Sequence, residues 1–213
     1  MFRIVFPPKC ILCQQLLSKE ETDLCHSCRA NTENFSRTKN AIPFVAHWTA
    51  LWYYKDDVRK SIQRFKFGRR RRYANAYGRM LAMKLSGSFG TDADILSWVP
   101  VSPLRKFRRG YDQSQLLAHS VGNLLQLPTM AVLRKCRHTP PQSTISGAAQ
   151  RRGNVMGAYR VIDPKAIAGK RILLLDDVVT TGATASECAK MLLIAGAKEV
   201  YLAAVAAAPH DKK

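Results

Sequence analysis

An apolar strand that ends in two acids constrains the fold of this chain more than any other feature. Residues 171–184 read RILLLDDVVTTGAT, so a run of apolar residues leads directly into Asp176 and Asp177. A continuous apolar run is typical of a strand buried on both faces, as in a parallel sheet covered by helices. The Thr/Gly-rich stretch leads into a predicted helix over 183–195, with Gly196 as its C-cap. We therefore expect a strand, a turn and a helix in that order.

Strands and helices alternate through the rest of the chain from residue 47 onward. The expected strands cover residues 47–54, 95–101, 131–134, 158–162, 171–175 and 199–208. The expected helices lie before Gly68 and over residues 73–85, 114–127 and 183–195, and Asp56 or Asp57 caps the first of them. This order predicts an α/β domain over residues 47–208, with a mostly parallel sheet and helices on both faces.

The turn after the acids has the composition of a phosphate site. A helix N-terminus offers unpaired backbone N–H groups and the positive end of the helix dipole, and a glycine lets the backbone approach an anion closely. Neighbouring carboxylates cannot bind phosphate, but they can accept hydrogen bonds from sugar hydroxyls. The sequence therefore predicts a ribose 5-phosphate site in which the phosphate is held by Thr180, Thr181, Gly182, Ala183 and Thr184.

Two other interpretations of the acid pair remain open. Adjacent acids after a strand can hold Mg²⁺ in a phosphoryl-transfer site, although the chain lacks the GxxxxGK[ST] loop of such enzymes. The pair can also be an ordinary strand-end turn, which leaves the Thr/Gly run unexplained.

A basic stretch, VPVSPLRKFRRGYDQSQLLA, follows the strand expected at 95–101. We expect it to form a loop that binds a second phosphate group, a pyrophosphate, because ligands of parallel sheets bind beyond the carboxyl ends of the strands. The alternative is a solvated basic surface. The cations concerned are Arg105, Lys106, Arg108 and Arg109. A polar segment, residues 137–154, is expected to be a mobile hood over the ligand, with Arg151, Arg152 and Asn154 near its return.

Four of the six cysteines form two Cys-x-x-Cys pairs in a short polar segment, residues 1–35. Zn²⁺ takes four thiolates tetrahedrally, and the metal then holds together a segment too small for a core of its own. We expect a structural zinc site formed by Cys10, Cys13, Cys25 and Cys28. Two disulfides or free thiols are the alternative. Residues 36–46 would then link this zinc-ribbon-like module to the α/β domain.

The charge balance favours a polyanionic partner, because 34 Lys+Arg face 15 Asp+Glu and give a formal net charge of +19. Residues 59–72 hold eight cations and no acid, and Phe65 and Phe67 lie among them. Single-strand binders combine cations with aromatic stacking platforms, so single-stranded DNA is a candidate partner. The residues expected to contact it are Arg64, Lys66, Arg69, Arg70, Arg71 and Arg72. A solvated helix face is the alternative. No apolar run approaches the roughly 20 residues of a membrane span, so we expect a cytoplasmic protein.

The stretch LLLDDVVTTGAT resembles the signature of the type I phosphoribosyltransferase family. The resemblance implies that 5-phosphoribosyl-1-pyrophosphate (PRPP) is bound with Mg²⁺, that Asp176 and Asp177 contact the ribose hydroxyls as catalytic residues, and that residues 180–184 hold the 5′-phosphate. Purine-salvage members have an aspartate that faces the purine where this chain has Thr180, so a hypoxanthine- or guanine-type reaction is not expected.

The order of the motifs resembles the ComF family of bacterial competence-associated proteins. The motifs are the two Cys-x-x-Cys pairs, RFKFGRR, VPVSPLRKFRRGYDQSQLLA, TPPQSTISGAAQRRGN and the PRPP signature, and they run from Cys10 to about Val205. The resemblance implies a role in the uptake or use of external DNA. Three hypotheses follow: a phosphoribosyltransferase with an unnamed acceptor, a single-stranded DNA factor that uses the PRPP pocket as a sensor or phosphate site, and an adaptor for the uptake machinery.

Overall fold

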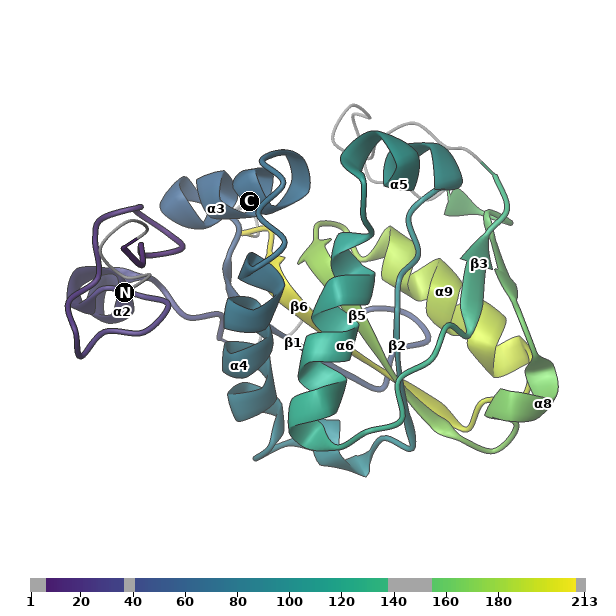
Figure 1. Ribbon diagram of the computed structural model, residues 1–213. Coiled ribbons are helices and arrows are strands. Elements are labelled where there is room, and N and C mark those ends of the chain that lie inside the picture. Colours follow the sequence, from purple (N-terminus) through teal and green to yellow (C-terminus); the bar gives the residue numbers. More distant parts are fainter. Residues whose placement is uncertain (1–6, 37–40, 138–154, 210–213) are drawn as a thin grey trace.

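Four parallel strands form the central sheet, in the order β1-β6-β5-β2 (Figure 1). The computed structural model describes residues 7–36, 41–137 and 155–209. The strands of the sheet are β1 (His47–Tyr53), β2 (Ile95–Trp98), β5 (Arg171–Val179) and β6 (Glu199–Ala207). The two long central strands, β5 and β6, pair along nearly their whole length, which explains the continuous apolar sequence of β5.

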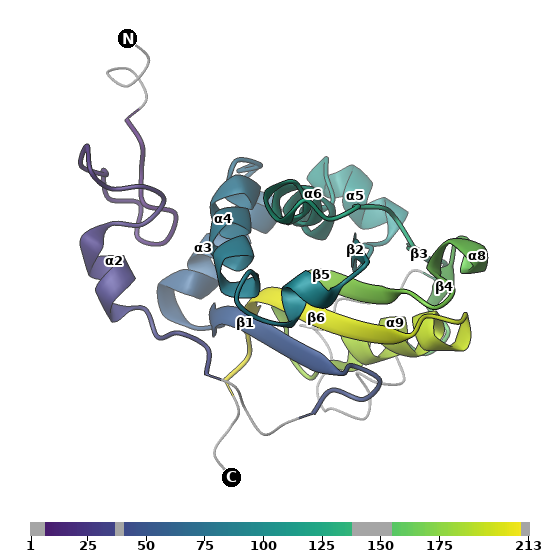
Figure 2. The same ribbon diagram turned by 90° about the horizontal axis from the view of Figure 1, so that it is seen from below.

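Helices cover both faces of this sheet, as Figure 2 shows from below. Because side chains alternate across a strand, Leu173 packs in the core cluster that contains residues of α3, α4 and α6, and Leu174 packs in the cluster that contains residues of α9. The helices are α2 (His26–Asn31), α3 (Asp56–Phe67), α4 (Tyr73–Leu85), α5 (Pro103–Arg109), α6 (Gln113–Leu125), α8 (Pro164–Ile167), α9 (Ala183–Ile194) and the 3₁₀ turn η1 (Phe89–Asp92). Within the described ranges, no helix is long and apolar enough to cross a membrane.

The predicted α/β fold with a mostly parallel sheet is confirmed, with one difference in strand membership. The expected strands at 131–134 and 158–162 are the three-residue strands β3 (Leu133–Lys135) and β4 (Tyr159–Val161), which pair antiparallel with each other. They form a separate two-stranded ribbon beside α9, and the buried Leu133 and Tyr159 pack in the same core cluster as that helix. The chain thus crosses the flank of the sheet without extending it.

Three local expectations are corrected by the structure. Strand β5 continues past the acids to Val179, because β6 runs alongside it to Ala207. Strand β2 ends at Trp98, short of the predicted 101, where Pro100 lacks the N–H that a ladder needs. The N-cap of α3 is Lys55, without a side-chain hydrogen bond, so Asp56 and Asp57 lie in the first turn, where they complement the helix dipole.

The cysteine-rich segment at the N-terminus packs directly against the α/β domain. Its apolar residues Ile11, Leu12 and Leu24 belong to the same buried cluster as Phe65 of α3 and Tyr73 of α4. The short helix α2 lies in this segment, on the outer side of α3 and α4 in both views (Figures 1 and 2). The module therefore shares its core with the domain that follows it.

Candidate functional site

The acid pair lies where β5 runs on beyond the end of its neighbour β2. The pairing of β2 with β5 ends at Trp98 opposite Leu175, one residue before Asp176. Asp176 Oδ1 accepts hydrogen bonds from Ser114 Oγ of α6 at 3.2 Å and from the Asp177 backbone N–H at 2.8 Å. Asp177 is buried, and its Oδ1 forms an ion pair with Lys66 Nζ at 2.7 Å. The two carboxylates are therefore held by different helices.

The surroundings of Asp176 favour its protonated form. Burial and, after it, the neighbouring Asp177 raise the pKa of Asp176, and Lys66, the Asp177 N–H and Ser114 lower it, with a net result of about 7. Asp112, which caps α6 through a bond from the Gln115 N–H, also has its pKa raised by burial. Two acids with pKa values moved in this way at the carboxyl end of a strand are typical of a functional site.

The expected phosphate turn begins α9 with a glycine in the left-handed conformation. Gly182 is the N-cap of this helix with φ +73°, and the Thr181 hydroxyl accepts a hydrogen bond from the Ala183 N–H at 3.4 Å. A Cβ built on Gly182 would lie 3.0 Å from Ile42 Cγ1, so the turn rests on a side chain from the expected linker. Thr184 is partly buried and hydrogen-bonds the Tyr159 hydroxyl. The backbone at 182 thus requires glycine for two independent reasons.

Gly182→Ala should lower the free energy of unfolding by about 2 kcal/mol or more, through left-handed strain of about 1–2 kcal/mol and crowding against Ile42. Gly169→Ala is the matched control, because Gly169 has φ +70° but open space around its Cβ position. Urea denaturation of the two variants separates the two effects. Equal losses in both would mean that Ile42 moves aside without resistance.

A lysine and a tyrosine that sequence reasoning did not select lie beside the acid pair. Lys135 of β3 pairs in register with Tyr159 of β4, and its Nζ lies 5.1 Å from the centre of the Tyr159 ring. Burial and, after it, Arg105 lower the pKa of Lys135, and Cys188 and Asp176 raise it, with a net result of about 8. No local sequence signal marks these residues, because only the pairing of two short strands brings them to the site.

The four cations expected in a pyrophosphate loop lie instead on the short helix α5. Pro103 at its start and the C-cap Gly110, with φ +77°, are helix signals that the sequence contains. Arg105 is partly buried toward Lys135 and Tyr159, and burial lowers its pKa. Lys106 donates to Gln115, Arg109 donates to Gln113, and Arg108 is exposed. The structure therefore brings Arg105 alone of these four toward the acid pair through the contacts described. The hood residues Arg151, Arg152 and Asn154 lie outside the described residues.

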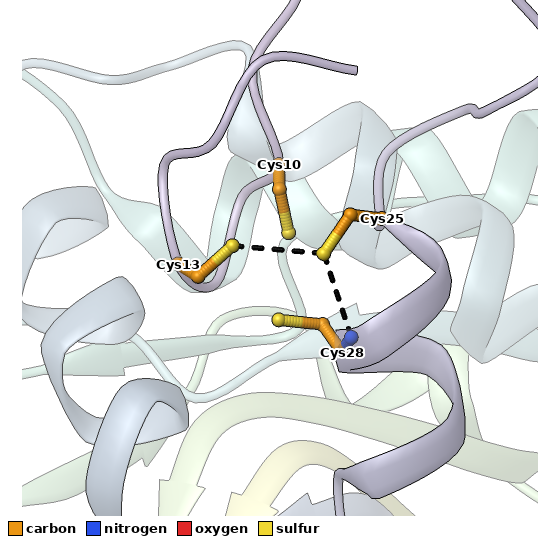
Figure 3. A group of neighbouring side chains, drawn as sticks. All are labelled: Cys10, Cys13, Cys25 and Cys28. Carbon is orange, nitrogen blue, oxygen red and sulfur yellow. Dashed lines mark hydrogen bonds between the residues drawn. The ribbon is translucent and has the colours of Figure 1, made fainter. Parts of the chain in front are cut away.

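The side chains of the four cysteines in the two Cys-x-x-Cys motifs point toward one another, as Figure 3 shows. Their sulfur atoms all lie within 4.8 Å of one another, and Cys13 Sγ is 3.6 Å from Cys25 Sγ. A zinc ion with four Zn–S bonds of about 2.3 Å requires sulfur atoms about 3.8 Å apart, so the donor set fits the metal. Burial raises the pKa of the Cys28 thiol, and its contacts with the three other cysteines raise it further, so four thiolates need a cation between them. With four protein ligands the zinc site is structural.

The basic stretch 59–72 is divided between the interior and the surface. Arg64 and Lys66, both expected to contact nucleic acid, point inward: the Arg64 guanidinium donates to the carbonyls of Ile11 and Leu12, and Lys66 pairs with Asp177. Arg64 follows the buried Ser61 by three positions and Lys66 follows the buried Ile62 by four, so both lie beside the inward face of the helix, which explains this correction. The remaining four, Arg69, Arg70, Arg71 and Arg72, are exposed.

Comparisons with known proteins agree with this architecture. A model of the phosphoribosyl transferase domain matches residues 108–213, and a model of the double zinc ribbon domain matches residues 1–39. Competence protein F of Haemophilus influenzae is 26% identical over 217 residues, which cover 91% of this chain and 94% of that protein. Competence protein ComFC of Streptococcus pneumoniae is 25% identical, with 90% and 96% covered. DNA utilization protein YhgH of Escherichia coli (strain K12) is 34% identical, with 70% and 66% covered.

Among solved structures, the glutamine PRPP amidotransferase from B. subtilis matches with a TM-score of 0.44 and 24% identity, over 62% of this chain and 26% of that chain. The purine phosphoribosyltransferase from Pyrococcus horikoshii matches with a TM-score of 0.38 and 18% identity, over 63% and 73%. At these TM-scores the solved structures add nothing to the family matches.

The parallel sheet with an acid pair and a glycine turn at its strand ends, preceded by a four-cysteine ribbon, defines a type I phosphoribosyltransferase-like protein with an N-terminal zinc module. The motif order and the competence-protein relatives specify it further. The chain belongs to the ComF family of competence-associated proteins.

Proposed function

We propose that this protein binds PRPP with Mg²⁺ at the acid pair and the glycine turn, and that it acts in the uptake or use of external DNA. The observation that supports this most strongly is that Asp176 and Asp177 and the left-handed Gly182 turn lie together at the carboxyl ends of the central strands. The competence and DNA-utilization relatives support the biological role.

Each part of PRPP has a group of matching chemistry at this site. The turn residues 180–184 would hold the 5′-phosphate, and Asp176 and Asp177 would accept hydrogen bonds from the ribose hydroxyls. Arg105 would hold the pyrophosphate, and Lys135, which is partly buried beside it, would add a second cation there. If the ribose is transferred, these cations stabilise the leaving pyrophosphate while the acids orient the sugar. The proposal assigns no particular nucleobase or amine as the acceptor of the ribose.

Asp176→Asn/Asp177→Asn should weaken PRPP·Mg²⁺ binding at least tenfold, because a hydrogen bond to a charged group contributes about 1.5–3 kcal/mol. Calorimetric titration of the zinc-loaded protein measures this. The control is Asp56→Asn/Asp163→Asn, which removes the same charge from exposed positions.

The sign of the change decides the outcome. Removing two acids from the neighbourhood of a polyanion weakens repulsion, so carboxylates that do not touch the ribose would give a variant that binds more tightly. A folded wild type that does not bind PRPP at all would overturn the proposal. Release of pyrophosphate with a panel of nucleobases and amines then tests whether the bound PRPP turns over.

A second candidate function is contact with single-stranded DNA, favoured by an exposed basic and aromatic surface. Phe67 is 69% exposed and Phe107 is 85% exposed, which is unusual for such large apolar rings. The Arg109 guanidinium lies 5.0 Å from the centre of the Phe67 ring. Next to them is a depression of about 270 Å³, lined by Arg69, Arg71, Phe107, Arg108, Arg109, Gly110 and Tyr111. Exposed rings among arginines are the arrangement that single strands use for stacking and backbone contact.

A further inference from the structure

The ion pair between Lys66 and Asp177 lies in the interior of the protein. The two atoms are 2.7 Å apart, and the side chains are only 19% and 9% exposed. Surface pairs contribute little, whereas a charge left alone in a buried position is strongly unfavourable. Lys66 is therefore part of the surroundings of the acid pair and is not available to bind a nucleic acid.

The end of α3 that carries Lys66 is fixed to the start of α6. The Tyr111 hydroxyl donates to the carbonyl of Phe65, and Gln113 Nε2 donates to the carbonyl of Lys66 at 3.5 Å. Ser114, the next residue along α6, donates to Asp176. Lys66 and Ser114, the partners of the two carboxylates, are thus fixed relative to each other by the contacts between α3 and the start of α6.

Shortly before Lys66, at Ser61 and Arg64, α3 is bound to the first zinc knuckle. The Arg64 guanidinium donates to the carbonyl of Ile11 at 3.1 Å and to that of Leu12, and Ser61 Oγ donates to the carbonyl of Ile11 at 2.5 Å. Both carbonyls lie between Cys10 and Cys13 of the metal site. A single helix therefore carries contacts to the zinc knuckle and to the acid pair two residues apart.

We propose that Lys66 is a positioning residue of the ribose site: it fixes Oδ1 of Asp177 so that the second oxygen faces the ribose diol, and the contacts of Arg64 and Ser61 with the zinc knuckle fix Lys66 in turn. This inference rests on the proposed function only in assigning the diol to the acid pair. By this inference the zinc module helps to order the ribose site, although its four cysteines do not themselves belong to that site.

The groups that face the acid pair come from every element around it. Lys66 approaches from α3, Tyr77 from α4, Asp112 and Ser114 from the start of α6, Lys135 from β3, Tyr159 from β4 and Cys188 from α9. Lys66 lowers the pKa of Asp176, and Asp177 raises it. Removing Lys66 leaves the mutual repulsion of the acids, so the pKa of Asp176 should rise above about 7 and the pair should hold a proton at neutral pH.

The test is a titration of aspartate side-chain carboxyl ¹³C signals in the zinc-loaded full chain, together with calorimetry of PRPP·Mg²⁺ at pH 7 and pH 8.5. Lys66→Met should raise the pKa of Asp176 by at least one unit and weaken PRPP binding at least tenfold, more at pH 7 than at pH 8.5. Lys66→Arg should restore both. Lys60→Met, on the exposed face of the same helix, should change neither.

Arg64→Lys tests the link to the zinc module, because it keeps the charge and loses the forked contact with two carbonyls. It should move the pKa of Asp176 in the same direction as Lys66→Met, by a smaller amount, with zinc still bound. An unchanged titration in this variant would overturn the link to the knuckle.

The titration separates this inference from the proposed function. A Lys66→Met variant that titrates like wild type, or one that titrates differently but binds PRPP with wild-type affinity, overturns the positioning role. If wild type does not bind PRPP, the proposed function fails, and the shift in the pKa of Asp176 alone decides whether Lys66 orders the acid pair.

Discussion

Cys25→Ser should remove the zinc and lower the melting temperature of the whole chain by about 10 °C or more, not merely unfold the first 35 residues. Burial of a large apolar side chain contributes about 1.5–3 kcal/mol, and Ile11, Leu12 and Leu24 are held against α3 and α4 by the metal. Each kcal/mol shifts the melting temperature of a chain of this size by about 2–4 °C. Metal analysis and calorimetric melting measure both effects.

Polar contacts across the same interface add to this expectation. Gln14 donates to the Tyr73 hydroxyl at 2.8 Å, and Arg79 of α4 forms a two-pronged ion pair with Asp23 at 2.9 and 2.6 Å. The control is Cys136→Ser, because Cys136 is exposed and outside the cluster. A Cys25→Ser protein that lost zinc but melted like wild type would mean that the knuckle keeps its shape without metal.

The sequence predicts the parts of this protein that local patterns encode. The apolar run before Asp176, the Thr/Gly turn and the cysteine spacing each reflect a rule that acts over a few residues, and the predicted helix over 73–85 coincides with α4. The parallel sheet follows from the alternation of elements. These patterns are sufficient for the fold and for the core of the candidate site.

What the sequence did not indicate depends on contacts between distant segments. Lys66 and Asp177 are 111 positions apart, and nothing in a run of basic residues shows which one turns inward. Lys135 reaches the site only because two three-residue strands pair outside the main sheet. The helix over the basic stretch is hard to predict for a different reason: its seven residues hold too few apolar positions to show a helical period, so only Pro103 and Gly110 mark its ends.

Replacing both exposed rings, Phe67→Ala/Phe107→Ala, should weaken the binding of a single-stranded oligonucleotide by 10-fold or more. Stacking of a base on an aromatic ring contributes about 1–3 kcal/mol, or about 5- to 150-fold for each ring. Both rings are at a surface that is already hydrated, so their loss leaves the core intact. Fluorescence anisotropy with a labelled oligo-dT measures the affinity, and Met83→Ala, which removes an exposed apolar side chain from α4, is the control.

The arginines of this surface should act through charge and therefore through salt. The slope of log K against log salt is negative, and Arg69→Gln/Arg70→Gln/Arg72→Gln should reduce its magnitude by about 2. Each phosphate contact on a single strand contributes about 0.7 to that magnitude. Arg71 is left in place because it donates to the carbonyl of Gly110 at 2.8 Å and shapes the depression. The matched triple variant, Arg134→Gln/Arg160→Gln/Lys170→Gln, removes the same charge from exposed positions on β3, on β4 and before β5. Equal losses of slope in the two triple variants would show that the net charge of +19 attracts DNA without a defined surface, whereas a loss confined to the first assigns the contact to the end of α3 and to α5.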